Sequence, residues 1–109
     1  MEQPVPDLLS QVVFSILLAL SLKPRHGYEL MQQIKQDALG KFELGPGTLY
    51  SALRQLGETN FIEEVPSELP SDRRRNYRLT KKGWDRLESE MKYYQNLIQL
   101  GQQRRLLGA

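Results

Sequence analysis

The sequence contains no cysteine, one histidine and one tryptophan. Without cysteine the chain forms neither disulfides nor thiolate metal sites, and a cytoplasmic location is the simplest expectation. The single histidine, His26, is too few for a histidine-rich zinc site. We therefore expect no metal and no other cofactor.

The sequence also lacks a segment long enough to cross a membrane. Its longest apolar run, residues 12–22, is interrupted by Ser15 and Ser21 and is shorter than a bilayer crossing requires. The N-terminal residues lack the basic start and the small-residue cleavage site of a signal peptide. We expect no membrane partner.

Common catalytic motifs are missing too. Residues 45–48, Gly-Pro-Gly-Thr, are not followed by the Gly-Lys-Ser/Thr of a phosphate-binding loop. The chain has no Gly-x-Ser-x-Gly nucleophile elbow. We expect that the protein is not an enzyme.

The net charge is only +2, from 15 Lys and Arg against 13 Asp and Glu, but the charge is unevenly distributed. Residues 73–82 contain basic side chains and no acid: Arg73, Arg74, Arg75, Arg78, Lys81 and Lys82. A cluster of this kind is suited to contact nucleic-acid phosphates, and a solvated basic loop has the same composition.

The first part of the chain shows two helical patterns. Residues 1–6 hold two prolines and predict a flexible N-terminal arm. Asp7 is the expected N-cap of a first helix that is apolar on several sides, and therefore buried at the centre of the domain. His26 and Gly27 open a second helix. Residues 41–44 follow as a short connection, in which we expect one extended residue pair.

Residues 45–56, GPGTLYSALRQL, predict a third helix. An apolar stripe at helical spacing predicts its buried side: Leu49, Ala52, Leu53 and Leu56. The opposite side carries small or hydrogen-bonding residues and one cation: Gly47, Thr48, Ser51, Arg54 and Gln55. A helix with such an outer face can lie in the major groove of DNA and contact base edges.

Two strands are expected next, at residues 61–65 and 73–79, joined by the turn-rich loop 66–72. Asn60 suits the left-handed conformation that often closes a helix. Three helices followed by two strands predict a winged helix-turn-helix, a mainly α (α+β) fold, with the arginines at the tip of the wing. We place this DNA-binding domain at residues 7–80.

Residues 81–109 are expected to form a long C-terminal dimerisation helix and tail, capped by Thr80. Its apolar and aromatic residues exceed what a small winged domain covers, and they predict the seam of a homodimer or an effector pocket there: Trp84, Leu87, Met91, Tyr93, Tyr94, Leu97 and Ile98. Aromatic rings can sandwich a small aromatic effector, and an interface core needs the same residue types.

With these residues in place, the chain resembles the PadR family of bacterial transcriptional regulators, in its compact branch with a single C-terminal helix. The matching stretches are ILLALSLKPRHGYELMQQI (16–34), GTLYSALRQL (47–56), NFIEE (60–64) and RRNYRLTKKG (74–83). Asn60 stands where the family usually has glycine.

The resemblance implies a dimeric winged-helix repressor that binds a near-palindromic operator and is often released by a small molecule. It implies that five residues of the third helix face DNA: Gly47, Thr48, Tyr50, Ser51 and Arg54. It further implies that His26 and Tyr28 lie near a phosphate, and that Arg73, Arg74 and Arg75 belong to the wing.

The residues themselves leave two roles open at several of these positions. Tyr50 either reaches a phosphate or packs on the wing, and Arg54 either pairs with a guanine or remains a surface residue. His26 either caps its helix or contacts a phosphate, and Tyr28 either contacts a phosphate or packs against the first helix. The modest net charge also permits a winged-helix protein-interaction module without DNA binding. We favour a sequence-specific DNA-binding regulator, acting as a repressor.

Overall fold

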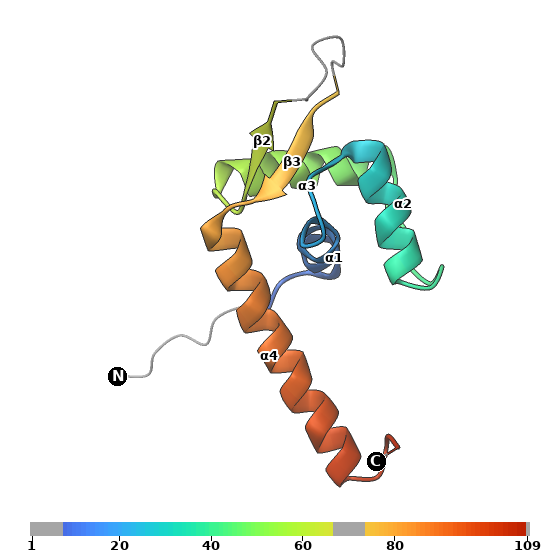
Figure 1. Ribbon diagram of the computed structural model, residues 1–109. Helices are drawn as coiled ribbons and strands as arrows, with labels where there is room; N and C mark the ends of the chain where they lie inside the picture. The colour runs from blue at the N-terminus through green and yellow to red at the C-terminus, as the bar shows by residue number, and fades with distance from the viewer. Residues whose placement is uncertain (1–7, 67–73, 109) are drawn as a thin grey trace.

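A computed structural model describes residues 8–66 and 74–108 of the protein. Its elements in chain order are α1 (Gln11–Leu20), β1 (Arg25–His26), α2 (Gly27–Asp37), α3 (Pro46–Glu58), β2 (Ile62–Val65), β3 (Asn76–Leu79) and α4 (Lys81–Gln103). Figure 1 shows α1 at the centre, with α2, α3 and the strands around it and α4 leading away. This is the predicted mainly helical winged helix-turn-helix.

The apolar pattern of α1 explains its central position. Ile16, Leu17 and Ala19 are completely buried, because neighbouring elements cover this helix from several sides. The stripe predicted for α3 faces the same core, which also receives the aliphatic residues of α2 and the sheet. One side of α3 therefore packs in the core, and the opposite side is exposed to solvent.

The predicted start of α1 is wrong. Ser10, not Asp7, is the N-cap, and its hydroxyl accepts a hydrogen bond from the backbone N–H of Val13 at 3.2 Å. Leu9 precedes the helix and donates its backbone N–H to the carboxylate of Glu90 at 2.8 Å. The residues around Leu9 give no indication of this bond, because its acceptor is 81 positions away in the sequence. The predicted arm at residues 1–6 lies outside the described residues.

Strand β1 was not predicted from the sequence. Arg25 and His26 pair with Tyr77 and Asn76 of β3, which gives a three-stranded antiparallel sheet in the order β1-β3-β2. The extended pair expected in residues 41–44 is not a strand. A two-residue strand has too little alternation to be recognised, and only its pairing with β3 defines it.

Both predicted strands of the wing are present, with β3 beginning at Asn76, and most of the predicted loop at residues 66–72 lies outside the described residues. A tight junction joins the strands to α3 and α4. Asn60 adopts the left-handed conformation with φ of 65°, and Thr80 caps α4 by accepting from the N–H of Gly83 at 3.1 Å. Gly83 packs so closely on the carbonyl oxygen of Phe61 that an added Cβ would overlap it. The end of β3 and the start of α4 are thereby fixed against the start of β2.

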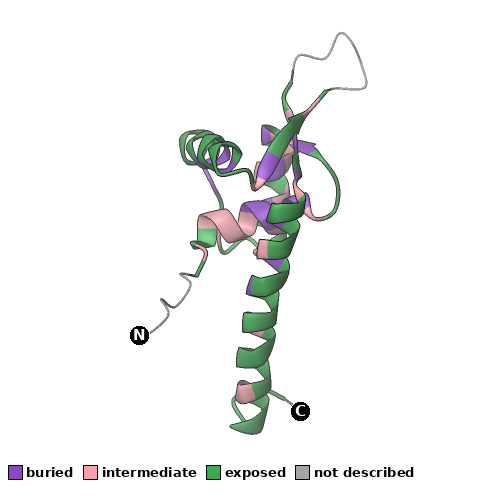
Figure 2. Cartoon of the chain, turned by 90° about the vertical axis from the view of Figure 1, so that its left-hand side faces the viewer, coloured by how far each residue is buried: buried purple, intermediate pink, exposed green. Residues whose placement is uncertain are grey.

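Helix α4 is buried only along part of its length. Figure 2 shows its far half almost entirely exposed. Leu87 is 4% exposed and belongs to the domain core, so its assignment to a dimer seam or effector pocket is wrong. Glu90 is 1% exposed and is held by Leu9 and Arg86. No helix within the described ranges is long and apolar enough to span a bilayer.

Candidate nucleic-acid interface

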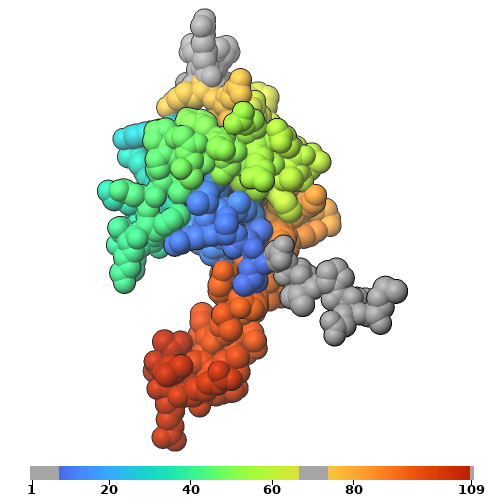
Figure 3. Space-filling model, turned by 180° about the vertical axis from the view of Figure 1, so that it is seen from behind, coloured from blue at the N-terminus to red at the C-terminus, as the bar shows by residue number. Residues whose placement is uncertain are grey.

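The outer side of α3 forms an exposed, mainly polar surface. The residues of α3 expected to face DNA are all exposed: Gly47, Thr48, Tyr50, Ser51 and Arg54. Figure 3 shows α3, in green, lying across the upper part of the molecule when it is seen from behind. Gly45, the N-cap, has no side chain to accept from the first N–H groups of α3. The first turn of α3 therefore has no side-chain cap.

Arg54 stands out on this surface. It makes no hydrogen bond or ion pair with any residue that the structure describes, and its side chain is exposed. A free guanidinium on the outer side of a helix is able to form the bidentate contact with a guanine edge. The structure therefore leaves both predicted roles of Arg54 open, since a surface arginine has the same surroundings.

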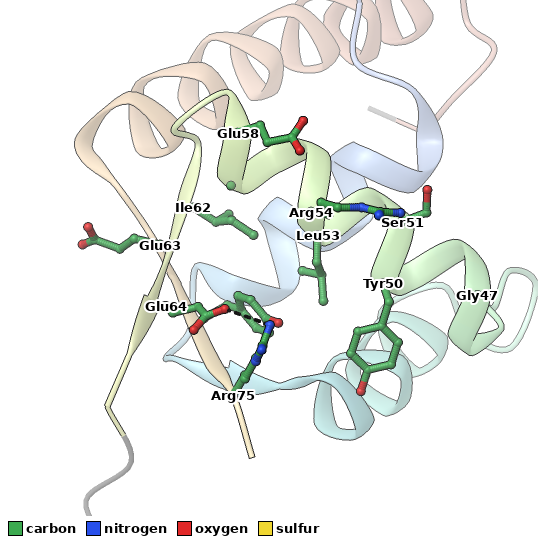
Figure 4. A pocket seen from close by; sticks show the side chains of 12 residues that line it. Gly47, Tyr50, Ser51, Leu53, Arg54, Glu58, Ile62, Glu63, Glu64 and Arg75 are labelled. Carbon is green, nitrogen blue, oxygen red and sulfur yellow. Dashed lines mark hydrogen bonds and ion pairs between the residues drawn. The ribbon is translucent and has the colours of Figure 1, made fainter. Parts of the chain in front are cut away.

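A groove of about 610 Å³ lies between α3 and the strands of the wing. Figure 4 shows Tyr50, Arg54 and Leu53 on its helix side, with Glu64 and Arg75 opposite on the wing side. The groove joins the outer side of α3 to the base of the wing. A ligand lying along α3 would therefore also meet the wing.

A second, smaller cavity of about 250 Å³ brings together residues far apart in sequence: His26, Gly27, Tyr28, Tyr50, Arg74 and Arg75. A guanidinium nitrogen of Arg74 lies 2.9 Å from Nε2 of His26. Two arginines beside two tyrosine hydroxyls are suited to a phosphate oxygen, because they supply positive charge and several donors. Arg73 lies outside the described residues.

His26 is the N-cap of α2, which confirms one of its two predicted roles. Its Nδ1 accepts from the backbone N–H of Glu29 at 3.3 Å, and the Glu29 carboxylate accepts from the N–H of His26 at 3.4 Å. This reciprocal capping box fixes the start of α2. It also holds the imidazole beside Arg74.

The two tyrosines of the small cavity are placed differently. The Tyr50 ring lies over Gly27, so closely that a Cβ on Gly27 would overlap its hydroxyl. Tyr50 therefore packs on the start of α2 as well as bordering the wing groove. Tyr28 is exposed, and its hydroxyl accepts from Nε2 of Gln32 on its own helix at 3.2 Å.

The described part of the basic run, residues 74–82, does not form a uniform positive patch. Arg78 pairs with Glu63 at 2.8 Å, and Arg75 pairs with Glu64 at 3.5 Å. Both acids lie on β2, which is antiparallel to β3. The sequence separates these acids from the arginines by ten or more positions, and only strand register brings them together. These partners were missed by the sequence analysis.

Tyr77 lies at the inner side of the same groove. Burial raises its pKa, and the negative charge of Glu64 raises it further, while the positive charge of Arg75 opposes the shift. The phenol is therefore protonated at neutral pH.

The residues proposed for the α4 seam fall into two groups. Tyr94 turns inward, and its ring meets that of Phe14 at a centroid distance of 5.2 Å. The remaining members of the set, apart from the core residue Leu87, are exposed: Trp84, Met91, Tyr93, Leu97 and Ile98. The set of residues that the sequence predicted for the seam or pocket is therefore divided between the domain core and the solvent-exposed sides of α4.

Comparison with known proteins agrees with this architecture. The family model of the transcriptional regulator PadR-like family matches residues 16–89. A PadR family transcription regulator from Clostridium difficile is similar in structure, with 28% identity, a TM-score of 0.74 and coverage of 86% of this chain and 97% of that chain. A transcriptional regulator from Clostridium thermocellum gives 25% identity and a TM-score of 0.69, covering 82% of this chain and 84% of that chain.

A protein of Lysinibacillus sphaericus, described as uncharacterised protein X, is 32% identical over 79 residues, which are 71% of this chain and 72% of that protein. The winged helix-turn-helix fold and the family match together place the chain among DNA-binding transcription regulators. The chain belongs to the PadR-like family, as the match over residues 16–89 shows.

Proposed function

We propose that the protein is a repressor that binds a near-palindromic operator as a homodimer, with one α3 helix in each of two major grooves about a helical turn apart. The main support is the groove that Arg54 of α3 and Arg75 of the wing both border. Helix α3 would contact bases, and Arg74 and Arg75 would contact phosphates.

The exposed line on α4 supports the homodimer. Trp84, Met91 and Ile98 are spaced seven residues apart, which places them on one side of the helix over four turns. All three are exposed in the single chain. In a two-fold dimer, this line on one protomer would pack against the same line on its partner.

A small aromatic effector is the second part of the proposal. Trp84 is an exposed aromatic residue on the α4 line proposed for the seam, and its ring is able to stack on a flat ligand there. Such a ligand would change DNA affinity only if it bound two arrangements of the winged domains with different affinity. Because Trp84 is the sole tryptophan, quenching of its fluorescence on ligand addition tests this directly.

The DNA-binding proposal is tested by fluorescence anisotropy with a duplex from upstream of the protein's own gene and a scrambled duplex of equal composition, at two salt concentrations. We expect tighter and salt-sensitive binding to the first duplex. Equal, salt-steep binding to both would refute sequence-specific recognition. Absence of binding to either duplex at low salt would favour the protein-interaction module. A DNA partner implies a cytoplasmic protein, and we infer no enzymatic role.

A further inference from the structure

The loop end of the wing strands carries a charge arrangement that the DNA-binding role does not require. Arg75 precedes β3 and faces the groove beside α3, where it is suited to meet a phosphate. Its guanidinium is instead 3.5 Å from the carboxylate of Glu64 (Figure 4). A carboxylate presents two negative oxygens to a guanidinium in much the same way as a phosphate does.

This ion pair does little for the fold. The side chains of Arg75 and Glu64 are 74% and 57% exposed, and an exposed pair of this kind contributes little to stability in water. Strand register holds the two residues as diagonal neighbours, since Glu64 lies opposite Tyr77, two positions from Arg75. The carboxylate is therefore kept beside Arg75 by the backbone, and it remains there when the pair opens.

Two further acids strengthen the negative charge in this region. Glu58 at the end of α3 and Glu63 on β2 also line the groove. Glu63 is already paired with Arg78, and it points away from the helix in Figure 4. Glu64 is the acid that directly contacts a wing arginine inside the groove.

We propose that Glu64 competes with DNA phosphate for Arg75 and thereby limits the affinity of the wing for duplex DNA of any sequence. The proposal rests on the DNA-binding function proposed above. Glu64 is a positioning residue, because it acts on DNA through Arg75. A phosphate that binds Arg75 must displace the carboxylate and then lies within a Debye length of its negative charge.

The test uses the full-length protein, a scrambled duplex and a duplex from upstream of its gene, with anisotropy titrations over a range of salt concentrations. Glu64→Gln keeps the side-chain size and removes the charge. We expect it to tighten binding to both duplexes by the same factor, roughly threefold to tenfold at low salt, and to steepen the logarithmic salt slope by about one unit for each wing in contact.

The matched control is Glu88→Gln. Glu88 is an exposed acid that pairs with Lys92 at 3.3 Å on α4, so the variant has the same net charge with the wing unaltered. A second control introduces Glu64→Gln into the Arg75→Gln variant, in which residue 75 no longer carries a guanidinium for the Glu64 carboxylate to pair with. We expect the gain in affinity to disappear there, and the urea unfolding midpoint of Glu64→Gln to equal that of the wild type.

Several results would overturn the proposal. Equal tightening by Glu64→Gln and Glu88→Gln would show an effect of net charge alone. A change confined to the upstream duplex would make Glu64 a base-contacting residue, and weaker binding would make it a favourable contact. Wild-type protein that binds neither duplex at low salt would refute the DNA-binding function itself, whereas normal wild-type binding with an unchanged Glu64→Gln variant would refute only the role of Glu64.

Discussion

Gly83 has no room for a side chain. A Cβ at this position would overlap the carbonyl oxygen of Phe61, which is backbone and cannot rotate away. We expect Gly83→Ala to lower the free energy of unfolding by about 1–3 kcal/mol, because the start of α4 must shift away from β2. Urea denaturation followed by circular dichroism measures the change.

The matched control for this prediction is Gly57→Ala. Gly57 lies within α3, and no atom is within 4 Å of a Cβ built there. Alanine is the better helix former, so this variant is expected to gain up to about 1 kcal/mol. If both variants shift stability in the same direction, the close contact with Phe61 is not what requires glycine at 83.

Arg54 tests base recognition at the scale of one side chain. We expect Arg54→Ala to relax the operator sequence preference at one position in each half-site, with a loss of about 1–3 kcal/mol of discrimination, because a bidentate contact to guanine is removed. Selection of binding sequences from a random pool gives the preference directly. Arg104→Ala, at the far end of α4, removes the same charge and should leave the preference unaltered. An unaltered preference in Arg54→Ala would assign the residue to the surface.

At the scale of elements, Glu90 connects α4 to the segment before α1. Its buried carboxylate accepts from Leu9 and lies 3.5 Å from a guanidinium nitrogen of Arg86. We expect Glu90→Ala to cost about 1–3 kcal/mol, because it removes the acceptor of a partly buried backbone N–H and the partner of Arg86. Glu88→Ala, at an exposed position of the same helix, should cost far less. Thermal or urea unfolding compares the two, and equal losses would show that the bond to Leu9 contributes nothing.

The wing gives a prediction about salt. Replacing Arg74 and Arg75 together by alanine removes two positive charges from the cavity beside His26. Binding to every duplex should weaken, and the logarithmic salt slope should become shallower by about two units per wing in contact, because two fewer counterions are released. Anisotropy titrations at four salt concentrations give the slope.

A double variant of Lys35 and Lys92 to alanine is the control, since both lysines are exposed, paired and outside the two cavities that border α3 and the wing. This double variant changes the net charge by the same amount as the replacement of Arg74 and Arg75. An equal change of slope in this control would mean that the wing arginines do not contact phosphate.

The elements that were predictable from sequence are those with a strong period or an end signal. The stripe of α3, the left-handed Asn60 and the Thr80 cap each depend on a few neighbouring residues. Strand β1, the burial of Glu90 and the pairing of Glu64 with Arg75 were missed. Each of these depends on contacts between segments far apart in the chain, for which a single sequence has no local signal.

The residues predicted for the seam on α4 show the same limit. The predicted set combined residues that lie on different sides of the helix, because the sequence does not say which of its apolar lines the domain covers. The line through Leu87 faces the core, and Trp84, Met91 and Ile98 remain exposed. The position of α1 decides between them, since Tyr94, seven residues after Leu87, meets the ring of Phe14 on α1 edge to face.

At the scale of the whole molecule, the exposed line on α4 gives a prediction about assembly and DNA binding together. Ile98 is 51% exposed in the single chain, so a charge there does not disturb the core. We expect Ile98→Asp to convert the proposed dimer to a monomer, because the new charge would be buried at its two-fold seam without a partner. Light scattering coupled to size-exclusion chromatography measures the mass.

The same variant should lose affinity for the operator while its winged domain stays folded. A dimer binds the second half-site intramolecularly, and loss of this linkage typically weakens binding about 10²- to 10⁴-fold. Asn96→Asp introduces the same charge at an exposed position on another side of α4, away from the line through Trp84, Met91 and Ile98, and should keep both the dimer mass and the affinity. A monomeric Ile98→Asp variant with wild-type affinity would show that one winged domain is sufficient for the operator. A dimeric variant would place the seam on another surface, because the line through Trp84, Met91 and Ile98 would then lie in solvent in both copies.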